Sequence, residues 1–203
     1  MKKTESKHQK SENRQKDILQ AALACFTEMG YDSASISDIC SRAGASVGSL
    51  YHHFGSKEQL AAQLYVSGIE TYQTGILAAL QQHADPRETV AAVIRYHLWW
   101  VEHYRDWAIY LSRMRHAPFM FGTEGELRRL NQSFGQTLSQ WFNQQQQART
   151  IRPMNLGLFI ALLLGPVQEY TRLYLAGVPC TPLEEAAAEL SRAAWLAMRN
   201  DTA

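Results

Sequence analysis

The sequence predicts an all-α protein of about nine helices, on three observations. Apolar residues recur at intervals of three and four along most of the chain, which is the spacing of one helix face. No segment shows the sustained alternation of a half-buried strand. Capping residues, prolines and glycines separate the periodic segments at short intervals. With 203 residues, 46% of them hydrophobic, the chain can bury a core in one domain or in two closely joined ones.

The chain begins with a strongly basic segment. Residues 1–16 contain six lysines or arginines and two glutamates, a local excess of four positive charges. We interpret this segment as a flexible arm that follows a phosphate backbone or enters a minor groove. A disordered, solubilising tail is the alternative for residues 1–10. The first amphipathic helix is expected over residues 18–29, and it ends at Gly30.

Residues 35–57 predict two short helices joined by a tight turn. Ser35 and Asp38 have the spacing of a capping box, and Gly44 ends the first helix. Ser46 can cap the second helix. This is the pattern of a helix-turn-helix motif, whose second helix enters a major groove.

The second of these helices is expected to have a buried face and an exposed face. The buried face comprises Val47, Leu50 and Phe54, and on or near the exposed face lie Gly48, Ser49, Tyr51, His52 and His53. Small and hydrogen-bonding residues at the N-terminal end of such a helix suit contact with DNA.

Lys57 falls in the first turn of the next helix, which Ser56 and Gln59 cap. A cation there opposes the helix dipole unless an anion is bound at that end. We therefore interpret Lys57 as a phosphate contact; a solvated surface lysine is the alternative.

Four runs in this region resemble the DNA-binding domain of the TetR/AcrR transcriptional regulators. They are Ile36-Ser37-Asp38-Ile39, Ala43-Gly44-Ala45-Ser46, Gly48-Ser49-Leu50-Tyr51-His52-His53-Phe54 and Lys57-Glu58-Gln59-Leu60. The resemblance covers about residues 17–65 and implies a helix-turn-helix domain there, with residues 66–203 forming an effector-binding and dimerisation domain. DNA contacts are expected from Ser35, Ser46, Val47, Gly48, Ser49, Tyr51, His52, His53 and Lys57.

Six further helices are expected after the motif. The first runs from residue 57 to about 83 and is long enough to join two domains. Asp85-Pro86 signals the start of the next, and another covers residues 106–115. Thr123 and Glu126 suggest a capping box for a helix that runs to about residue 147. The last two begin at Asn155 and at the Thr181-x-x-Glu184 box.

Aromatic residues are concentrated in the C-terminal two-thirds, where all five tryptophans follow residue 95. Most are expected to be core, and for any one of them a purely structural role is the alternative to ligand contact. Mixed with polar residues they are also typical of a small-molecule pocket. The candidate effector-binding residues are His97, Trp100, Tyr104, Trp107, Tyr110, Met114, Phe119, Phe121, Trp141, Gln168 and Glu169. Gly165-Pro166 is expected to kink its helix, either to present Gln168 and Glu169 to a ligand or merely to wrap the helix around its neighbours.

The last two helices are more apolar than an outer layer requires, and their alanines permit close approach of another helix. The resemblance implies a homodimer built on these helices. The candidate interface comprises Leu162, Val167, Tyr170, Leu173, Tyr174, Leu183, Ala187, Leu190, Ala194 and Met198. Two recognition helices must meet successive major grooves about 34–36 Å apart, so a near-palindromic operator is expected.

Other function classes find little support in the sequence. No zinc-protease motif, nucleophile elbow or phosphate-binding glycine loop is present, so no catalytic residue, metal or cofactor is expected. The three cysteines have no metal or disulfide spacing, and Cys25 and Cys40 are expected in the core. Without an apolar leader, a cytoplasmic location is expected.

We therefore expect a DNA-binding regulator, most simply a repressor released from its operator by a small hydrophobic or aromatic effector. The alternative is a helix-turn-helix protein whose C-terminal domain serves only dimerisation or protein partners.

Overall fold

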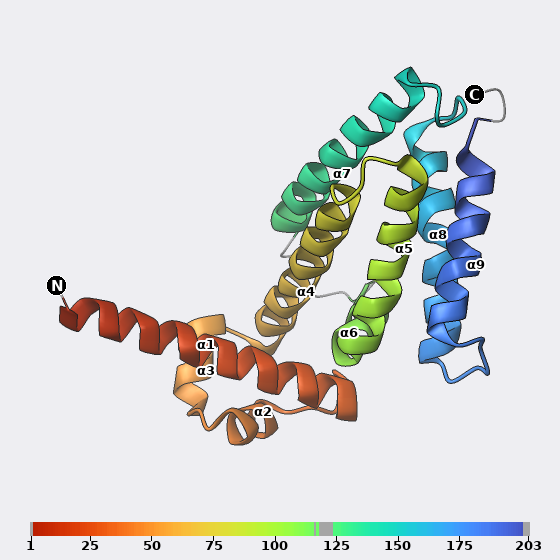
Figure 1. The fold of residues 1–203 in the computed structure, drawn as a ribbon. Coiled ribbons are helices and arrows are strands. Elements are labelled where there is room, and N and C mark those ends of the chain that lie inside the picture. The colour runs from red at the N-terminus through yellow and green to blue at the C-terminus, as the bar shows by residue number, and fades with distance from the viewer. Residues whose placement is uncertain (1, 116, 118–123, 201–203) are drawn as a thin grey trace. The chain divides into compact units, whose positions relative to one another are not determined.

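A computed structural model describes residues 2–115, 117 and 124–200 (Figure 1). In this part of the chain the backbone forms nine α-helices and, apart from one isolated bridge between Ile151 and Arg199, no strand, which confirms the all-α prediction. No helix among these residues is long and apolar enough to cross a bilayer. The helices are α1 (Lys2–Met29), α2 (Ile36–Ala43), α3 (Val47–Phe54), α4 (Lys57–Leu80), α5 (Pro86–His103), α6 (Arg105–Met114), α7 (Glu124–Gln147), α8 (Leu156–Leu175) and α9 (Leu183–Met198).

The chain divides into two compact units. The first comprises residues 1–69 and 106–127, and the second comprises residues 70–105 and 128–203. Helices α4 and α7 therefore contribute to both units, while nearly all of α6 belongs to the first. The sequence analysis drew a single boundary after residue 65, so its C-terminal domain included the α6 segment. That segment shares a core with α1 and α4 instead.

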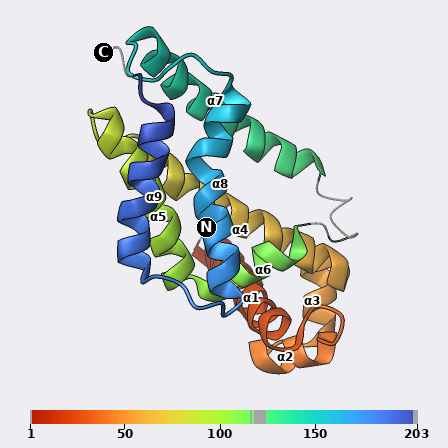
Figure 2. The same ribbon diagram turned by 90° about the vertical axis from the view of Figure 1, so that its right-hand side faces the viewer.

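In the first unit, α1, α2 and α3 contact one another around a common core. The red and orange helices of Figure 2 are these three elements. Each contributes apolar side chains at helical spacing, which keeps a small domain together by removing that surface from water. The fully buried members include Ile18, Ala22, Phe26, Ile39, Leu50, Leu60 and Leu64.

Helix α1 starts much earlier than predicted. The sequence analysis treated residues 1–16 as a flexible arm, but in the structure the helix begins at Lys2. The segment from residue 2 to residue 16 contains no glycine or proline and is rich in lysine, glutamine and glutamate. Because these residues favour helix, nothing in this stretch ends it before the apolar face begins.

Helix α6 joins the first unit through one buried tyrosine and one close approach. The Tyr110 hydroxyl donates to the carbonyl of Ala61 at 2.7 Å, and its ring lies 6.0 Å from that of Phe26. A Cβ added to Gly68 of α4 would lie only 2.6 Å from the Trp107 ring. The bare backbone at Gly68 is thus what lets α6 pack so closely on α4.

In the second unit, α5 packs along α9. Helix α8 contacts both of these helices (Figure 2). The buried alanines of α9 allow this close packing, since the distance between helix axes depends on side-chain size at the contact. Its core includes Ile76, Val93, Ile94, Leu98, Leu138, Phe142, Phe159, Leu163, Val167, Ala186, Ala187, Ala194 and Met198.

The predicted start signals in this unit are only partly correct. Asp85 caps α5 by accepting from the Arg87 amide at 2.9 Å, and Asn155 caps α8 in the same way. The predicted capping box at Thr181 was wrong, because α9 starts after Pro182 with no side-chain cap. Thr123 lies outside the described residues.

Candidate DNA-binding face and candidate ligand-binding core

Two side-chain caps and one left-handed residue define where α2 and α3 begin and where the turn between them lies. Ser35 Oγ accepts from the Asp38 amide at 3.1 Å, and the Asp38 carboxylate accepts from the Ser35 amide at 2.9 Å. Hydrogen bonds from the Ser35 side chain and backbone lower the pKa of Asp38. Gly44 has φ 58°, which a residue without Cβ adopts at little cost, and Ser46 Oγ then accepts from the Ser49 amide at 3.1 Å to start α3. These contacts produce the predicted helix-turn-helix.

Arg14 of α1 forms hydrogen bonds to this turn, which were not predicted from the sequence. Its Nη1 donates to the carbonyl of Gly44 at 2.9 Å and to that of Ala43 at 3.3 Å. A guanidinium at the C-terminus of α2 also complements the helix dipole. The sequence carried no local signal for a contact that spans about thirty positions.

Helix α3 buries Leu50 and Phe54 against the core, and its other residues are half-buried or exposed. Tyr51 is 48% exposed and Val47 is 46% exposed. The sequence analysis placed Val47 on the buried face, and this was wrong. In a helix of eight residues, only the side chains that contact neighbouring helices are buried. Val47 is the first residue of α3 and lies one turn before Leu50, the first buried residue of the helix.

The other candidate DNA contacts lie on the same motif. No atom lies within 4 Å of a Cβ built at Gly48, so packing does not require glycine there, and its bare backbone is open to an approaching ligand. Ser35, Ser46, Gly48 and His52 are exposed, and Ser49 and His53 are half-buried.

Lys57 is held at the start of α4 from two sides. Its Nζ donates to the carbonyl of Asp32 at 3.4 Å and lies 4.5 Å from the centroid of the Tyr31 ring. Ser56 Oγ accepts from the Gln59 amide at 3.1 Å, as predicted for the helix start. Burial, with a smaller contribution from Glu58, raises the pKa of Tyr31 to about 12. The lysine is therefore oriented rather than freely mobile.

In the second unit, a hydrogen-bonded cluster of polar side chains from three helices centres on His97. The Tyr72 hydroxyl of α4 lies 2.7 Å from His97 Nδ1, and Thr171 Oγ1 of α8 lies 2.9 Å from His97 Nε2. His97 is only 6% exposed, and its burial lowers its pKa to about 4. Burial also raises the pKa of Tyr72. The imidazole is thus neutral at pH 7, with both ring nitrogens occupied.

Trp100 lies one turn further along α5, and its indole N–H has no hydrogen-bond acceptor among the described residues. The residue is 4% exposed, and its Nε1 is buried with no acceptor among the described residues. An unsatisfied buried N–H costs about 1–3 kcal/mol. Among the described residues it is the only buried side-chain nitrogen or oxygen in this condition.

A series of aromatic rings connects Trp100 with the surface. Its ring centroid lies 5.2 Å from that of Tyr72 and 5.9 Å from that of Tyr104. Tyr104 is 42% exposed and also contacts Trp99, at 5.8 Å. Aromatic contacts thus run from the buried Trp100 to the exposed Tyr104 at the end of α5.

Only some of the candidate effector residues lie in this cluster around His97 and Trp100. His97, Trp100 and Tyr104 do so, whereas Trp141 packs on Phe159 in the main core. Gln168 and Glu169 are exposed, and Glu169 pairs with Arg172 at 2.6 Å. Pro166 lies exposed within α8, which continues through it. Trp107, Tyr110 and Met114 belong to the first unit, and Phe119 and Phe121 lie outside the described residues.

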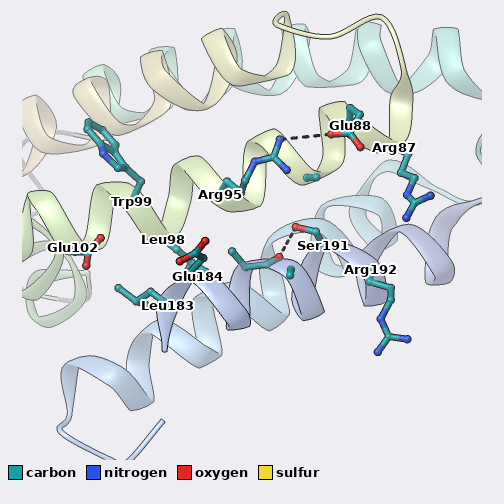
Figure 3. A pocket seen from close by; sticks show the side chains of 13 residues that line it. Arg87, Glu88, Arg95, Leu98, Trp99, Glu102, Leu183, Glu184, Ser191 and Arg192 are labelled. Carbon is teal, nitrogen blue, oxygen red and sulfur yellow. Dashed lines mark hydrogen bonds and ion pairs between the residues drawn. The ribbon is translucent and has the colours of Figure 1, made fainter. Parts of the chain in front are cut away.

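The second unit also has an open groove of about 560 Å³ between α5 and α9, which none of the candidate effector residues lines (Figure 3). Arg87 and Arg192 lie toward one end, and Trp99 and Glu102 toward the other. Its walls mix cations with carboxylates, and Arg95 pairs with Glu88 at 3.7 Å. Trp99 contributes to the lining of this groove, while its neighbour Trp100 is buried.

Four candidate dimer residues are covered by their own chain. They are Val167, Ala187, Ala194 and Met198, all buried in the core of the second unit. Ala186, Ala187 and Ala194 of α9 are buried within the unit, and the sequence could not distinguish an intramolecular partner from a second copy. Leu162, Leu173, Tyr174, Leu183 and Leu190 are half-buried, and so is Tyr170, whose hydroxyl donates to the Thr181 carbonyl. The most exposed large apolar residues of these two helices are Leu158 (42%) and Leu196 (49%).

The cysteines agree with the sequence analysis where the structure tests it. Cys25 and Cys40 are buried in the first core, and Cys180 is half-buried. Burial raises the pKa of the Cys40 thiol.

Comparison with known proteins finds similarity to one family within the first unit. Residues 18–64 match the family model for bacterial regulatory proteins of the tetR family. The HTH-type transcriptional regulator BetI of Rhizobium meliloti is 37% identical over 82 residues, which are 40% of this chain and 40% of that protein. The HTH-type transcriptional repressor AcnR of Corynebacterium efficiens is 42% identical over 48 residues. The chain thus spans about 40% or less of the length of these two curated relatives.

Solved structures share the fold over nearly the whole chain. A TetR family transcription regulator from Marinobacter aquaeolei is 20% identical, with a TM-score of 0.80 over 95% of this chain and 99% of that one. The regulator FadR of Bacillus subtilis, solved with stearoyl-CoA, is 17% identical, with a TM-score of 0.74 over 88% and 96% of the two chains. At these identities the likeness concerns the fold.

Proposed function

We propose that the chain is a homodimeric, effector-responsive repressor of transcription of the tetR family, on the premise that residues 18–64 match the model for that family. One observation carries the proposal, namely the capped and exposed face of α3 within a matched tetR domain. That face presents a bare backbone at Gly48 beside the exposed side chains of Tyr51 and His52.

The proposed contacts divide into two classes. Tyr51, Ser49 and His52 read base edges in the major groove, because they lie on the outer face of the second helix of the motif. Lys57 binds a phosphate, because it is the first residue of α4, where the N–H groups of the helix start also favour an anion. Phosphate contacts set the register, and base contacts set the sequence preference.

Dimerisation supplies the second recognition helix. We place the interface on the surfaces of α8 and α9 that their own chain leaves uncovered, with Leu158 and Leu196 at its centre. Val167, Ala187, Ala194 and Met198 are excluded from it by their burial. A two-fold dimer implies an operator with two inverted half-sites whose centres lie about 34–36 Å apart.

The proposed effector site is the core around His97, Trp100 and Tyr104. Chain connectivity links it to the DNA-binding unit, because α4 carries both Tyr72 and Lys57 and because α5 leads directly into α6. A coupling free energy of about 1–3 kcal/mol between effector and DNA would release an operator.

The stoichiometry of the DNA complex tests the dimeric part of the proposal. Sedimentation equilibrium with a bound duplex should give two chains per operator. One chain per duplex at saturation would contradict the proposed two-fold assembly.

A further inference from the structure

The buried N–H donor of Trp100, which has no acceptor among the described residues, indicates the class of effector that this core would bind. We propose that the effector is an uncharged aromatic molecule bearing a hydrogen-bond acceptor, such as a ketone, ester or amide oxygen, which receives the Trp100 N–H while its ring takes the place of Tyr104. The inference rests on the proposed function, because it specifies the ligand class of the same effector site.

The need for an acceptor follows from the hydrogen bonds of the cluster. His97 already has a partner at each ring nitrogen, in Tyr72 and Thr171. Trp100 Nε1 is buried without one among the described residues. An indole nitrogen can only donate, so its missing partner must accept.

The absence of charge on the ligand follows from the surroundings. The two hydrogen-bond partners of His97, Tyr72 and Thr171, are uncharged side chains, and burial is the only cause of the lowered pKa of His97. An ionised ligand would lose its hydration here without gaining a counter-ion, which is costly in a buried site. The neutral imidazole of His97 offers it no charge.

The aromatic character and the place of the ligand follow from Tyr104. Its ring lies 5.9 Å from the Trp100 ring, yet 42% of the residue is exposed, so it can rotate outward without unpacking the core. The vacated space is one aromatic ring in size and lies against Trp100. A ligand ring there restores the contact and brings its acceptor into a buried environment.

Three probes of similar shape test the proposal on the full chain. Acetophenone has the ring and the neutral acceptor, ethylbenzene lacks the acceptor, and benzoate carries a charge. Binding is followed by the indole ¹H–¹⁵N resonances of the five tryptophans, with the Trp100 signal assigned by its loss in Trp100→Phe. Acetophenone should shift that signal downfield, and ethylbenzene should not. Benzoate should bind at least tenfold more weakly than acetophenone.

The variants isolate the hydrogen bond. Trp100→Phe keeps an aromatic ring but removes the donor, so it should weaken acetophenone binding about tenfold and leave ethylbenzene binding unchanged. Trp141→Phe, a tryptophan of the same unit with no such role, is the matched control and should keep the preference for the ketone. Tyr104→Ala should bind acetophenone more tightly than the wild-type chain, and this test holds even if Trp100→Phe does not fold.

Equal binding of ketone and hydrocarbon, tighter binding of benzoate, or no shift of the Trp100 signal at millimolar acetophenone would overturn the proposal. Operator binding is measured separately. A chain that binds acetophenone through Trp100 but selects no DNA sequence would refute the regulator function alone. A chain whose operator is released by a compound indifferent to Trp100→Phe would refute the inference alone.

Discussion

Lys57 and Tyr51 lie close in sequence but have different surroundings, and this difference separates their proposed roles. The lysine is oriented by the Asp32 carbonyl and the Tyr31 ring, whereas Tyr51 is 48% exposed on α3. Lys57→Ala should weaken binding to all duplexes alike and lower the slope of log K against log salt by about one. Tyr51→Ala should instead change the preferred sequence. Fluorescence anisotropy on specific and scrambled duplexes at several salt concentrations distinguishes them, and identical behaviour of the two variants would contradict the division of contacts.

His97 makes stability depend on pH in a defined window. Its pKa in the folded chain is about 4, below the ordinary value of 6.5, so between these values the unfolded chain binds more protons. The contribution of neutral His97 to the free energy of unfolding is complete above pH 6.5. It is lost as pH falls toward 4, which lowers the free energy of unfolding by up to about 3 kcal/mol. In urea unfolding, the free energy of unfolding of His97→Gln should depend less steeply on pH than that of the wild-type chain. His83→Gln, at an exposed histidine, is the control and should keep the wild-type slope.

At the residue scale the sequence was most informative where a local rule applies. The caps Ser35, Ser46 and Asp85 were predictable because each bonds a backbone amide two or three positions away. Arg14 was not predictable, because its partners lie about thirty positions along the chain. The unmatched donor of Trp100 likewise depends on what three-dimensional packing leaves around it.

At the scale of elements, the contact between α4 and α6 depends on a glycine. A Cβ at Gly68 would lie 2.6 Å from the Trp107 ring, so Gly68→Ala must displace α6 from α4. We expect it to destabilise the chain by about 1–3 kcal/mol. Gly135→Ala in α7 is the matched control, because no atom lies within 4 Å of the added Cβ, and it should be neutral or stabilise by up to about 1 kcal/mol. Thermal unfolding measures both changes, and equal melting temperatures for the two variants would show that the close approach is unimportant.

Element types and most helix starts were predictable, but their partners were not. The apolar faces of α6 and α9 are visible in the sequence, yet periodicity does not say what covers them. Tyr110 of α6 packs with Phe26, and three alanines of α9 are buried in the core of their own chain. The extension of α1 to Lys2 was missed because charge was taken as a sign of disorder, although the same residues favour helix.

At the scale of the whole molecule, the proposed dimer depends on the apolar side chains that α8 and α9 leave exposed. Leu196→Glu places a charge at the centre of the proposed interface and should convert the dimer to a monomer, with loss of tight operator binding. Met29→Glu, at a similarly exposed apolar residue of the first unit, is the control and should remain dimeric. Analytical ultracentrifugation reports the outcome, and a Leu196→Glu chain that sediments as a dimer would place the interface elsewhere.

The central claim, that this chain reads a two-fold symmetric DNA sequence, is tested most directly by selecting bound duplexes from a random library with the purified protein. We predict enrichment of an inverted repeat whose half-sites are centred about one helical turn, or a whole number of turns, apart. The enrichment should persist at moderate salt, since base contacts contribute to it. No enriched sequence, together with binding that disappears at moderate salt, would contradict the claim.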